Sequence, residues 1–320
     1  MADAAAYRAV GTLYNALMTA LVLGLVTRRG EDTAREYVLR HFRRQHLEKF
    51  LPGLKKLGLA DEPDAPACAL YHYHSNALGG VKTGYLRESD RKAWVRYPPP
   101  RWIWRGTAIA AVPHSVSAAM LHGWHGHNGV SLGNPRLGFV CTGMTVDGMP
   151  GLEGYYFEHD ASLAEAGRVR FAYGEEAMPR FDPAAAPKLD TATWPPERLA
   201  RTYRRYAMEY VRTMLMESPH DELARVARLV GLQFYEETSN GEPFADWLRS
   251  MLAGQGEEVA ADLSIARWRL VEGLQLTDLP GAFSAWNELW VGASLAHDRF
   301  LKLVATHQVR DGTLSARWSL

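Results

Sequence analysis

Histidines are concentrated in one stretch of this chain, between His114 and Asp160. Five of the twelve histidines fall there, three of them in the sequence His-Gly-Trp-His-Gly-His at 122–127. Neutral imidazole is a common metal ligand, and histidine is the side chain that titrates nearest neutral pH. The same stretch contains Cys141 and the carboxylates Glu158 and Asp160. These residue types predict a functional site that uses metal or acid–base chemistry.

The first hypothesis is a divalent metal site, with zinc as the expected metal. The candidate ligands are His72, His74, His122, His125 and His127. His72 and His74 are separated by one residue and would share a face of a strand. Gly123 and Gly126 would let the segment with His122, His125 and His127 close over that face. Glu158 or Asp160 would add an oxygen ligand, and an open coordination position would activate water. Because the spacing matches no zinc hydrolase signature, hydrogen-bonded histidines in a polar pocket are the alternative.

The second hypothesis is catalysis by side chains alone. Cys141 near an imidazole is a candidate nucleophile through its thiolate, although a buried, inert cysteine is the alternative. His125 is the candidate general base. His159 and Asp160 would supply a base with an orienting carboxylate, but sequence neighbours face each other on neither a strand nor a helix. Asp160 is therefore expected to cap a helix or to pair with an arginine.

Aromatic residues accompany these groups and suggest contacts to a substrate. The candidate substrate-binding residues are Trp124, Tyr73 and Glu158. Tryptophan side chains would suit a flat or cyclic ligand, but packing in a core is the alternative use for large aromatic rings. The tryptophans concerned are Trp94, Trp102, Trp104, Trp124, Trp286 and Trp290.

Composition narrows the expected partners. Lysine plus arginine and aspartate plus glutamate each total 36 in a chain of 320 residues, so neither nucleic acid nor an anionic membrane is expected. Cys68 and Cys141 are too few for a disulfide scaffold, which favours a cytoplasmic setting. The apolar segment 9–26 runs into charged residues without a cleavage site, so it is expected to be a buried helix. A small-molecule substrate is expected, and a homodimer is one possible assembly.

The spacing of apolar residues predicts the secondary structure. The first half is expected to contain helices over 7–26, 31–50 and 115–120, strands over 67–74 and 137–145, and a hairpin of 83–88 with 92–97. Pro52-Gly53 is expected to interrupt or kink the second helix. The second half is expected to contain a helix over 199–214, a further helix after Ser218-Pro219, a helix over 243–252, a strand-like 264–271, a turn or helix over 283–290, and a hairpin of 300–309 with 313–318.

A polar, proline-containing run over 175–196 is the expected linker, and it separates residues 1–180 from residues 190–320. Both parts run from helices through strands to a terminal strand or hairpin. The segment 156–163 can also be overlaid on 294–301 through a shared His-Asp pair. We therefore expect an α+β fold of two related helix-plus-antiparallel-sheet halves that form a pseudo-dimer, with the histidine-rich pocket in the first half.

The first half resembles a known family in its helical start and in one later motif. Helices over 13–50 are followed by Cys141-Thr-Gly-Met-Thr-Val-Asp-Gly-Met-Pro-Gly-Leu-Glu-Gly-Tyr-Tyr-Phe-Glu-His-Asp160. A helical start with a cysteine, a Gly-x-Pro turn and an aspartate is similar to the L-2-amino-thiazoline-4-carboxylic acid hydrolase family. The resemblance implies hydrolytic opening of a small nitrogen-containing ring, with Cys141 and Asp160 as site positions. The histidine-rich loop and the long second half depart from that family.

Two functions follow from these observations. The first is a hydrolase that acts on a C–N or related bond of a small cyclic substrate, using water activated by a metal or by histidine. The alternative is a non-catalytic small-molecule-binding protein, because the chain also has a more distant resemblance to four-vinyl-reductase-type ligand-binding domains.

Overall fold

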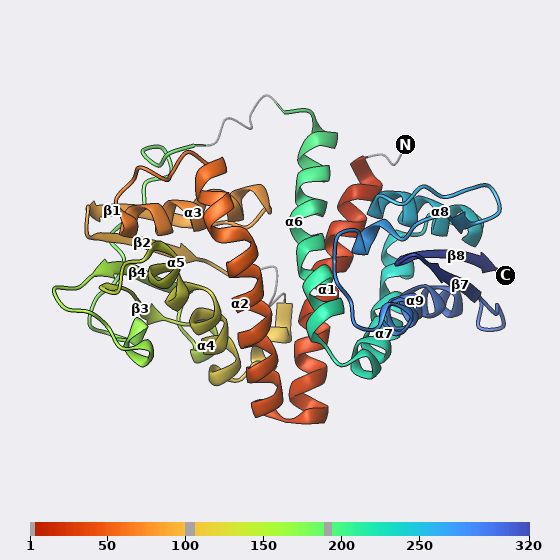
Figure 1. Cartoon of the computed structure of the whole chain (residues 1–320), viewed down its shortest axis with the longest axis horizontal. Coiled ribbons are helices and arrows are strands. Elements are labelled where there is room, and N and C mark those ends of the chain that lie inside the picture. The colour runs from red at the N-terminus through yellow and green to blue at the C-terminus, as the bar shows by residue number, and fades with distance from the viewer. Residues whose placement is uncertain (1–3, 100–105, 189–193) are drawn as a thin grey trace. The chain divides into compact units, whose positions relative to one another are not determined.

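The computed structural model describes residues 4–99, 106–188 and 194–320, which form helices and sheets in an α+β fold (Figure 1). The fold class is as predicted.

The chain divides into two compact units. The sheet unit is Leu25–Thr193, and the bundle unit combines Met1–Gly24 with Trp194–Leu320. The units differ from the halves expected from the sequence, because the N-terminal segment joins the second part of the chain. The expected linker over 175–196 does contain the boundary between the units.

The sheet unit is built from helices and short strands. In chain order they are α2 (Glu31–Lys56), α3 (Asp64–Leu78), β1 (Gly84–Ser89), β2 (Lys92–Tyr97), η1 (Gly106–Ala111), α4 (His114–Gly123), η2 (His125–His127), α5 (Asn128–Leu132), β3 (Leu137–Gly143), η3 (Thr145–Asp147), β4 (Leu152–Glu158), η4 (Glu165–Arg168) and β5 (Val169–Phe171). The strands described form a sheet in the order β1-β2-β4-β3-β5, antiparallel except for the β3–β5 pair. The hairpin of β1 and β2 and the strand β3 are as predicted.

One face of this sheet has an apolar core of its own. Trp94, Val140 and Tyr155 come from the three central strands and pack with Ala172 and Met178 from the segment after β5. Since side chains alternate along a strand, the next residues on each strand face the opposite side.

The opposite face receives histidines from the helical layer. Tyr97 of β2, Phe139 of β3 and Tyr156 of β4 contact the rings of His72 on α3 and His125 on η2. Burial on both faces explains why β3 is buried along its whole length. This second face positions the candidate site.

Residues 67–74, predicted as a strand, belong to helix α3. The alternation of tyrosine and histidine imitates a period of two, but Asp64 in the first turn and the neighbouring alanines favour a helix. In a helix, residues two apart point about 200° away from each other. His72 and His74 therefore do not share a face.

Helix α2 continues through Pro52, so of the two expected outcomes, an interruption or a kink, the interruption does not occur. Gly53 lies directly against another helix, since a Cβ there would come within 2.4 Å of the ring of Tyr71. Phe50 and Leu54 on either side are buried. Packing of these residues offsets the backbone hydrogen bond that proline cannot donate.

The bundle unit contains most of the remaining elements. They are α1 (Ala4–Arg29), which continues past Gly24, followed by α6 (Pro196–Glu217), α7 (His220–Thr238), α8 (Phe244–Gln255), β6 (Ser264–Ile265), η5 (Arg269–Val271), α9 (Leu279–His297), β7 (Val304–Arg310) and β8 (Thr313–Ser319). The final hairpin is as predicted, with Asp311 and Gly312 both at positive φ, as a type I′ turn requires.

Helix α1 is the apolar helix expected over 9–26. Its length and composition would allow it to cross a membrane, but 67% of its most apolar window is buried. Within the bundle unit, the amide of Asn15 donates to the hydroxyl of Tyr203 at 2.6 Å, and the ring of Tyr14 lies 5.9 Å from that of Trp286. These contacts favour the predicted role as a buried helix.

The two units do not repeat one topology. The smaller sheet has three strands in the order β6-β8-β7, unlike the sheet unit. The overlay of 156–163 on 294–301 aligns the end of strand β4 with the end of helix α9. The shared His-Asp pair thus has no structural equivalence, and the pseudo-dimer is not supported.

Helices α7 and α9 approach each other most closely at two glycines. A Cβ at Gly231 would lie 2.0 Å from the carbonyl oxygen of Leu289, and one at Gly292 would lie 2.0 Å from that of Arg228. Glycine is required here because a methyl group would occupy the space of the facing backbone.

We predict that Gly292→Ala lowers the free energy of unfolding by about 2 kcal/mol or more, because the added methyl group must push the helices apart. Alanine favours a helix over glycine by about 1 kcal/mol, which opposes this effect and is smaller. Urea unfolding followed by circular dichroism measures the change. Leu229→Ala, at an exposed position of α7, is the control and should change stability by less than about 0.5 kcal/mol. Unchanged stability of Gly292→Ala would contradict the close approach.

Candidate functional site

The histidine-rich segment is held between α2 and the sheet by its glycines. A Cβ at Gly123 would lie 2.8 Å from the carbonyl oxygen of Leu39, and one at Gly126 would lie 2.7 Å from a methyl group of Val169. In the sequence, these glycines suggested a flexible segment that could close over His72 and His74. In the structure they allow close contact on both sides of the segment.

Arg43 of α2 fixes the point at which α4 ends. Its guanidinium donates to the carbonyl oxygens of His122 and Gly123, each at 3.1 Å. Such carbonyls have no partner within their own helix. Burial is the main cause that lowers the pKa of Arg43. After this end, η2 directs His125 towards the sheet.

Two of the predicted ligands, His72 and His125, come together as parallel rings. Their centroids are 4.3 Å apart and their planes differ by 8°. The ring of Tyr156 is parallel to His125 at 5.9 Å, and the hydroxyl of Tyr97 lies 3.4 Å from its Nε2 atom. Asn128 donates to the Tyr156 hydroxyl at 3.1 Å. We call His72, His125, Tyr97 and Tyr156 the imidazole cluster.

A second set of rings extends this cluster towards α2. The ring of His46 lies 5.6 Å from Trp124 and 5.2 Å from His127, and its Nε2 atom is 2.9 Å from the Ser131 hydroxyl. Trp124 also contacts His72 at 5.9 Å. Trp124 and His127 are therefore part of a packed aromatic region.

Burial keeps the imidazoles of His41, His46 and His127 neutral. It lowers the pKa of His41 on α2 to about 3, and it lowers that of His46 to about 3 with smaller effects of His127, His72 and Arg43. The pKa of His127 is lowered as well, chiefly by burial. At neutral pH the rings are therefore uncharged and act as polar members of a core.

The expected metal ligands do not form one group. In the described ranges 4–99, 106–188 and 194–320, no three His, Cys, Asp or Glu side chains gather in a way that could hold a metal ion. His74 points to another side of α3, where its ring contacts Tyr73, and His122 faces Phe171 at 6.1 Å. Only one pair of the five histidines is stacked together.

A different polar group lies at the end of β3. One oxygen of Asp147 is 2.8 Å from Nδ1 of His114 and accepts a hydrogen bond from the Tyr173 hydroxyl at 2.7 Å. Tyr173 is close enough to Cys141 for each to affect the pKa of the other. The ring of His114 rests 5.2 Å from Phe171. Residues from α4, η3, β3 and the segment after β5 thus meet at one place.

His114 and Asp147 form a pair suited to acid–base chemistry, which we call the acid–base pair. The side chain of His114 is 48% exposed and that of Asp147 is 24% exposed. A carboxylate at Nδ1 favours the tautomer that carries its hydrogen there, which leaves Nε2 with a lone pair. The imidazole is therefore oriented and also accessible to water.

Cys141 is close to this pair but is not activated by it. Burial, with a smaller effect of the charge of Asp147, raises the pKa of its thiol to about 12. The thiol donates to the carbonyl oxygen of Gly143 at 3.5 Å. At neutral pH it stays protonated, and a protonated thiol is a poor nucleophile.

The remaining predicted residues lie apart from both groups. Glu158 forms an ion pair with Arg136. Asp160 has a side chain that is 94% exposed and pairs with Arg91 at 2.6 Å, which confirms the arginine alternative.

The other aromatic candidates belong to packed surfaces. Tyr73 contacts Tyr85 of β1 at 5.8 Å. Three of the tryptophans considered in the sequence analysis are fully buried core residues, which agrees with the alternative of core packing: Trp94, Trp286 and Trp290. Trp102 and Trp104 lie outside the described residues.

The sequence did not single out His114, Asp147 and Tyr173 as a group. Asp147 and Tyr173 are 26 residues apart in the chain. The one available signal was that His114 opens the histidine-rich stretch.

Comparison with known proteins gives no relative, since no family model, curated protein or solved structure matches this chain. The resemblance to the hydrolase family stays a prediction.

We predict that the sheet unit loses stability as the pH falls below about 6.5, because protonation of the buried histidines favours the unfolded chain. The folded pKa of His41 and of His46 is about 3, below the ordinary value of 6.5. Their stabilising contribution is complete above the ordinary value and is lost as the pH falls through the folded value. Each adds a slope of about 1.4 kcal/mol per pH unit in that window.

Urea unfolding between about pH 7.5 and pH 5 measures this slope. His41→Leu should reduce the slope by about 1.4 kcal/mol per pH unit. Gln45→Leu replaces another buried polar residue of α2 that does not titrate, so it should leave the slope unchanged. An identical slope in His41→Leu and the unchanged protein would show that His41 is not buried as a neutral ring.

Proposed function

We propose that the chain is a hydrolase in which the acid–base pair of His114 and Asp147 activates water. The observation that carries the proposal is the 2.8 Å contact between Nδ1 of His114 and Asp147 at a partly exposed position. A histidine oriented by a carboxylate is a recurring general base, because the carboxylate fixes the tautomer and stabilises the imidazolium that forms.

Each residue of the group has a role in the proposed reaction. Nε2 of His114 takes a proton from water while the water oxygen bonds to an unsaturated carbon of the substrate. The π electrons of the ring C=N bond pass to the nitrogen, which receives this proton from His114. The C–N bond then breaks as the new hydroxyl group forms a C=O bond, and the hydroxyl proton passes through His114 to the nitrogen, which leaves as an amine. Asp147 holds the imidazole, and Tyr173 holds Asp147 through its hydroxyl.

The substrate class follows from the sequence resemblance. A small ring with a C–N bond at an unsaturated carbon is the substrate that the resemblance implies. Cys141 takes no part in the proposed step, because its thiol is protonated at neutral pH. Within the motif 141–160, the proposal therefore assigns a role to Asp147, whereas the resemblance implied Cys141 and Asp160.

We predict that His114→Asn lowers turnover of L-2-amino-thiazoline-4-carboxylic acid by about 100-fold or more, since removing a general base has effects of that size. Loss of the substrate and appearance of the ring-opened product are followed by liquid chromatography. His159→Asn is the matched control, because His159 also stands near a carboxylate in sequence but Asp160 pairs with Arg91 instead. It should retain turnover within about threefold.

Three results would contradict the proposal. They are equal losses in His114→Asn and His159→Asn, loss of turnover in a folded Cys141→Ala variant, and binding of this substrate without turnover by the unchanged protein. The last result would favour the alternative of a non-catalytic ligand-binding protein.

We further predict that turnover survives removal of divalent metals, because the proposed step needs only the imidazole and its carboxylate. Protein dialysed against a chelator, with residual zinc measured by elemental analysis, should keep its activity within about twofold. Activity that disappears with the metal and returns with added zinc would show that water is activated by zinc.

A further inference from the structure

The small sheet of the bundle unit has a long edge strand, β7 (Figure 1). Strand β8 lies between β6 and β7, so in the described part of the chain β7 has a neighbouring strand on one side only. Its seven residues pair with β8 without a bulge, from Val304 opposite Ser319 to Arg310 opposite Thr313. An unpaired edge of this kind is a template for a further strand.

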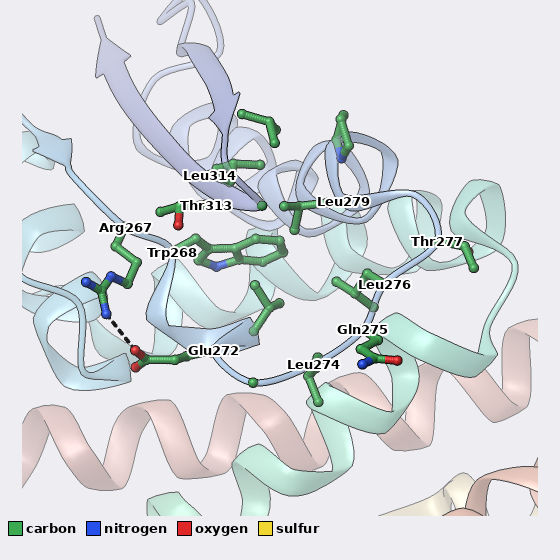
Figure 2. A pocket seen from close by; sticks show the side chains of 15 residues that line it. Arg267, Trp268, Glu272, Leu274, Gln275, Leu276, Thr277, Leu279, Thr313 and Leu314 are labelled. Carbon is green, nitrogen blue, oxygen red and sulfur yellow. Dashed lines mark hydrogen bonds and ion pairs between the residues drawn. The ribbon is translucent and has the colours of Figure 1, made fainter.

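The hydrogen bonds on the far side of β8 show which way its backbone groups point. The amide of Trp268 donates to the carbonyl oxygen of Leu314 at 2.8 Å, and Figure 2 shows these two residues beside each other. The amide of Trp318 donates to the carbonyl oxygen of Leu263 at 3.1 Å. Leu314 and Trp318 therefore direct their backbone groups away from β7.

The residues of β7 opposite these two direct their own backbone groups to the free edge. Opposite residues of an antiparallel pair either bond to each other or both point outwards. Val309 lies opposite Leu314, and Ala305 lies opposite Trp318. His307 is two residues from each of them and points the same way. The free edge thus presents the N–H and C=O groups of Ala305, His307 and Val309.

The other edge strands of the described sheets are protected against pairing with a further strand, and β7 is not. Proteins protect such edges with short strands, bulges and charged side chains. Strand β1 carries Arg87 and Glu88 and has a bulge between Arg87 and Ser89, while β5 has three residues and β6 has two. Strand β7 contains no proline, glycine, lysine or acidic residue, and its one arginine is at its end.

The sequence of β7 is complementary to itself when two copies run antiparallel. A two-fold axis at His307 places Ala305 of one copy opposite Val309 of the other, so the outward N–H and C=O groups of each copy find partners in the other. Val304 and Val309 are 41% and 42% exposed, and pairing would cover part of each. No like charges lie opposite each other in the remaining pairs, which are Thr306 with Gln308 and Val304 with Arg310.

We propose that two copies of this chain associate through β7, which joins their small sheets into one antiparallel sheet. A second copy fits this edge because the symmetric pairing uses every outward backbone group and creates no repulsion between fixed charges. One strand from each copy forms an interface below the roughly 1,200–2,000 Å² of stable complexes, so the dimer is weak and depends on concentration. The interface belongs to the bundle unit and is independent of the hydrolase proposal, which rests on residues of the sheet unit.

Sedimentation velocity on the full chain, from about 1 μM to about 1 mM, tests this proposal and should show a monomer–dimer equilibrium with a Kd on the order of 100 μM or below. His307→Lys places two ammonium groups opposite each other at the axis and should raise the Kd at least about fivefold. Ser319→Lys is the matched control, because it adds the same charge at an exposed position of β8, which lies inside the sheet. It should leave the Kd within about twofold.

Ala305→Pro tests the backbone pairing separately. Proline removes an N–H that points to the free edge and is not bonded to β8, so the hairpin should remain folded while the Kd rises at least about tenfold. Circular dichroism checks that all the variants are folded. Amide hydrogen exchange on the unchanged protein gives a measurement without any variant, since protection within residues 304–310 should increase with protein concentration.

Support requires a dimer that is weakened by His307→Lys and Ala305→Pro but not by Ser319→Lys. The proposal is overturned if the chain is a monomer at every concentration, or if the Kd is the same in all the variants. It is also overturned if the two lysine variants weaken the dimer equally, or if protection within residues 304–310 does not change with concentration. None of these results bears on the effect of His114→Asn.

Discussion

The packing of the sheet unit depends on histidines that are buried in it as neutral rings. Burial lowers the pKa of His41 and His46 to about 3, so these imidazoles stay uncharged at neutral pH. His72 and His125 stack on each other, and Tyr97 and Tyr156 add polar and aromatic contacts. Arg43 and the glycines of the histidine-rich segment then hold these rings in place.

The same exclusion of water separates the groups that can react from those that cannot. Burial leaves Cys141 as a protonated thiol, although it lies in the part of the chain with the most reactive residue types. His114 stands at the start of α4, where its side chain is still accessible and Asp147 orients it. Proximity of residue types is thus insufficient for chemistry, because accessibility and protonation decide which of them can act.

Glycine has a related role in both units. In the sheet unit, Gly123 and Gly126 allow a loop to approach a helix and a strand, and in the bundle unit Gly231 and Gly292 allow two helices to approach each other. At Gly123, Gly231 and Gly292 a backbone carbonyl of the facing element occupies the space that a side chain would need, and at Gly126 a methyl group of Val169 does so. These contacts are between elements distant in sequence, so local preference alone would have assigned these glycines to flexible or helix-breaking positions.

The sequence determined the elements that depend on local patterns. The spacing of apolar residues fixed α1 and α6, and Asp311-Gly312 fixed the last hairpin through its positive φ angles. The tertiary structure decided what depends on contacts across the chain. It made residues 67–74 a helix, directed His72 and His74 to different sides, and brought Asp147 to His114. The physical reason is that side-chain chemistry depends on distance and burial, and neither is a property of neighbouring residues alone.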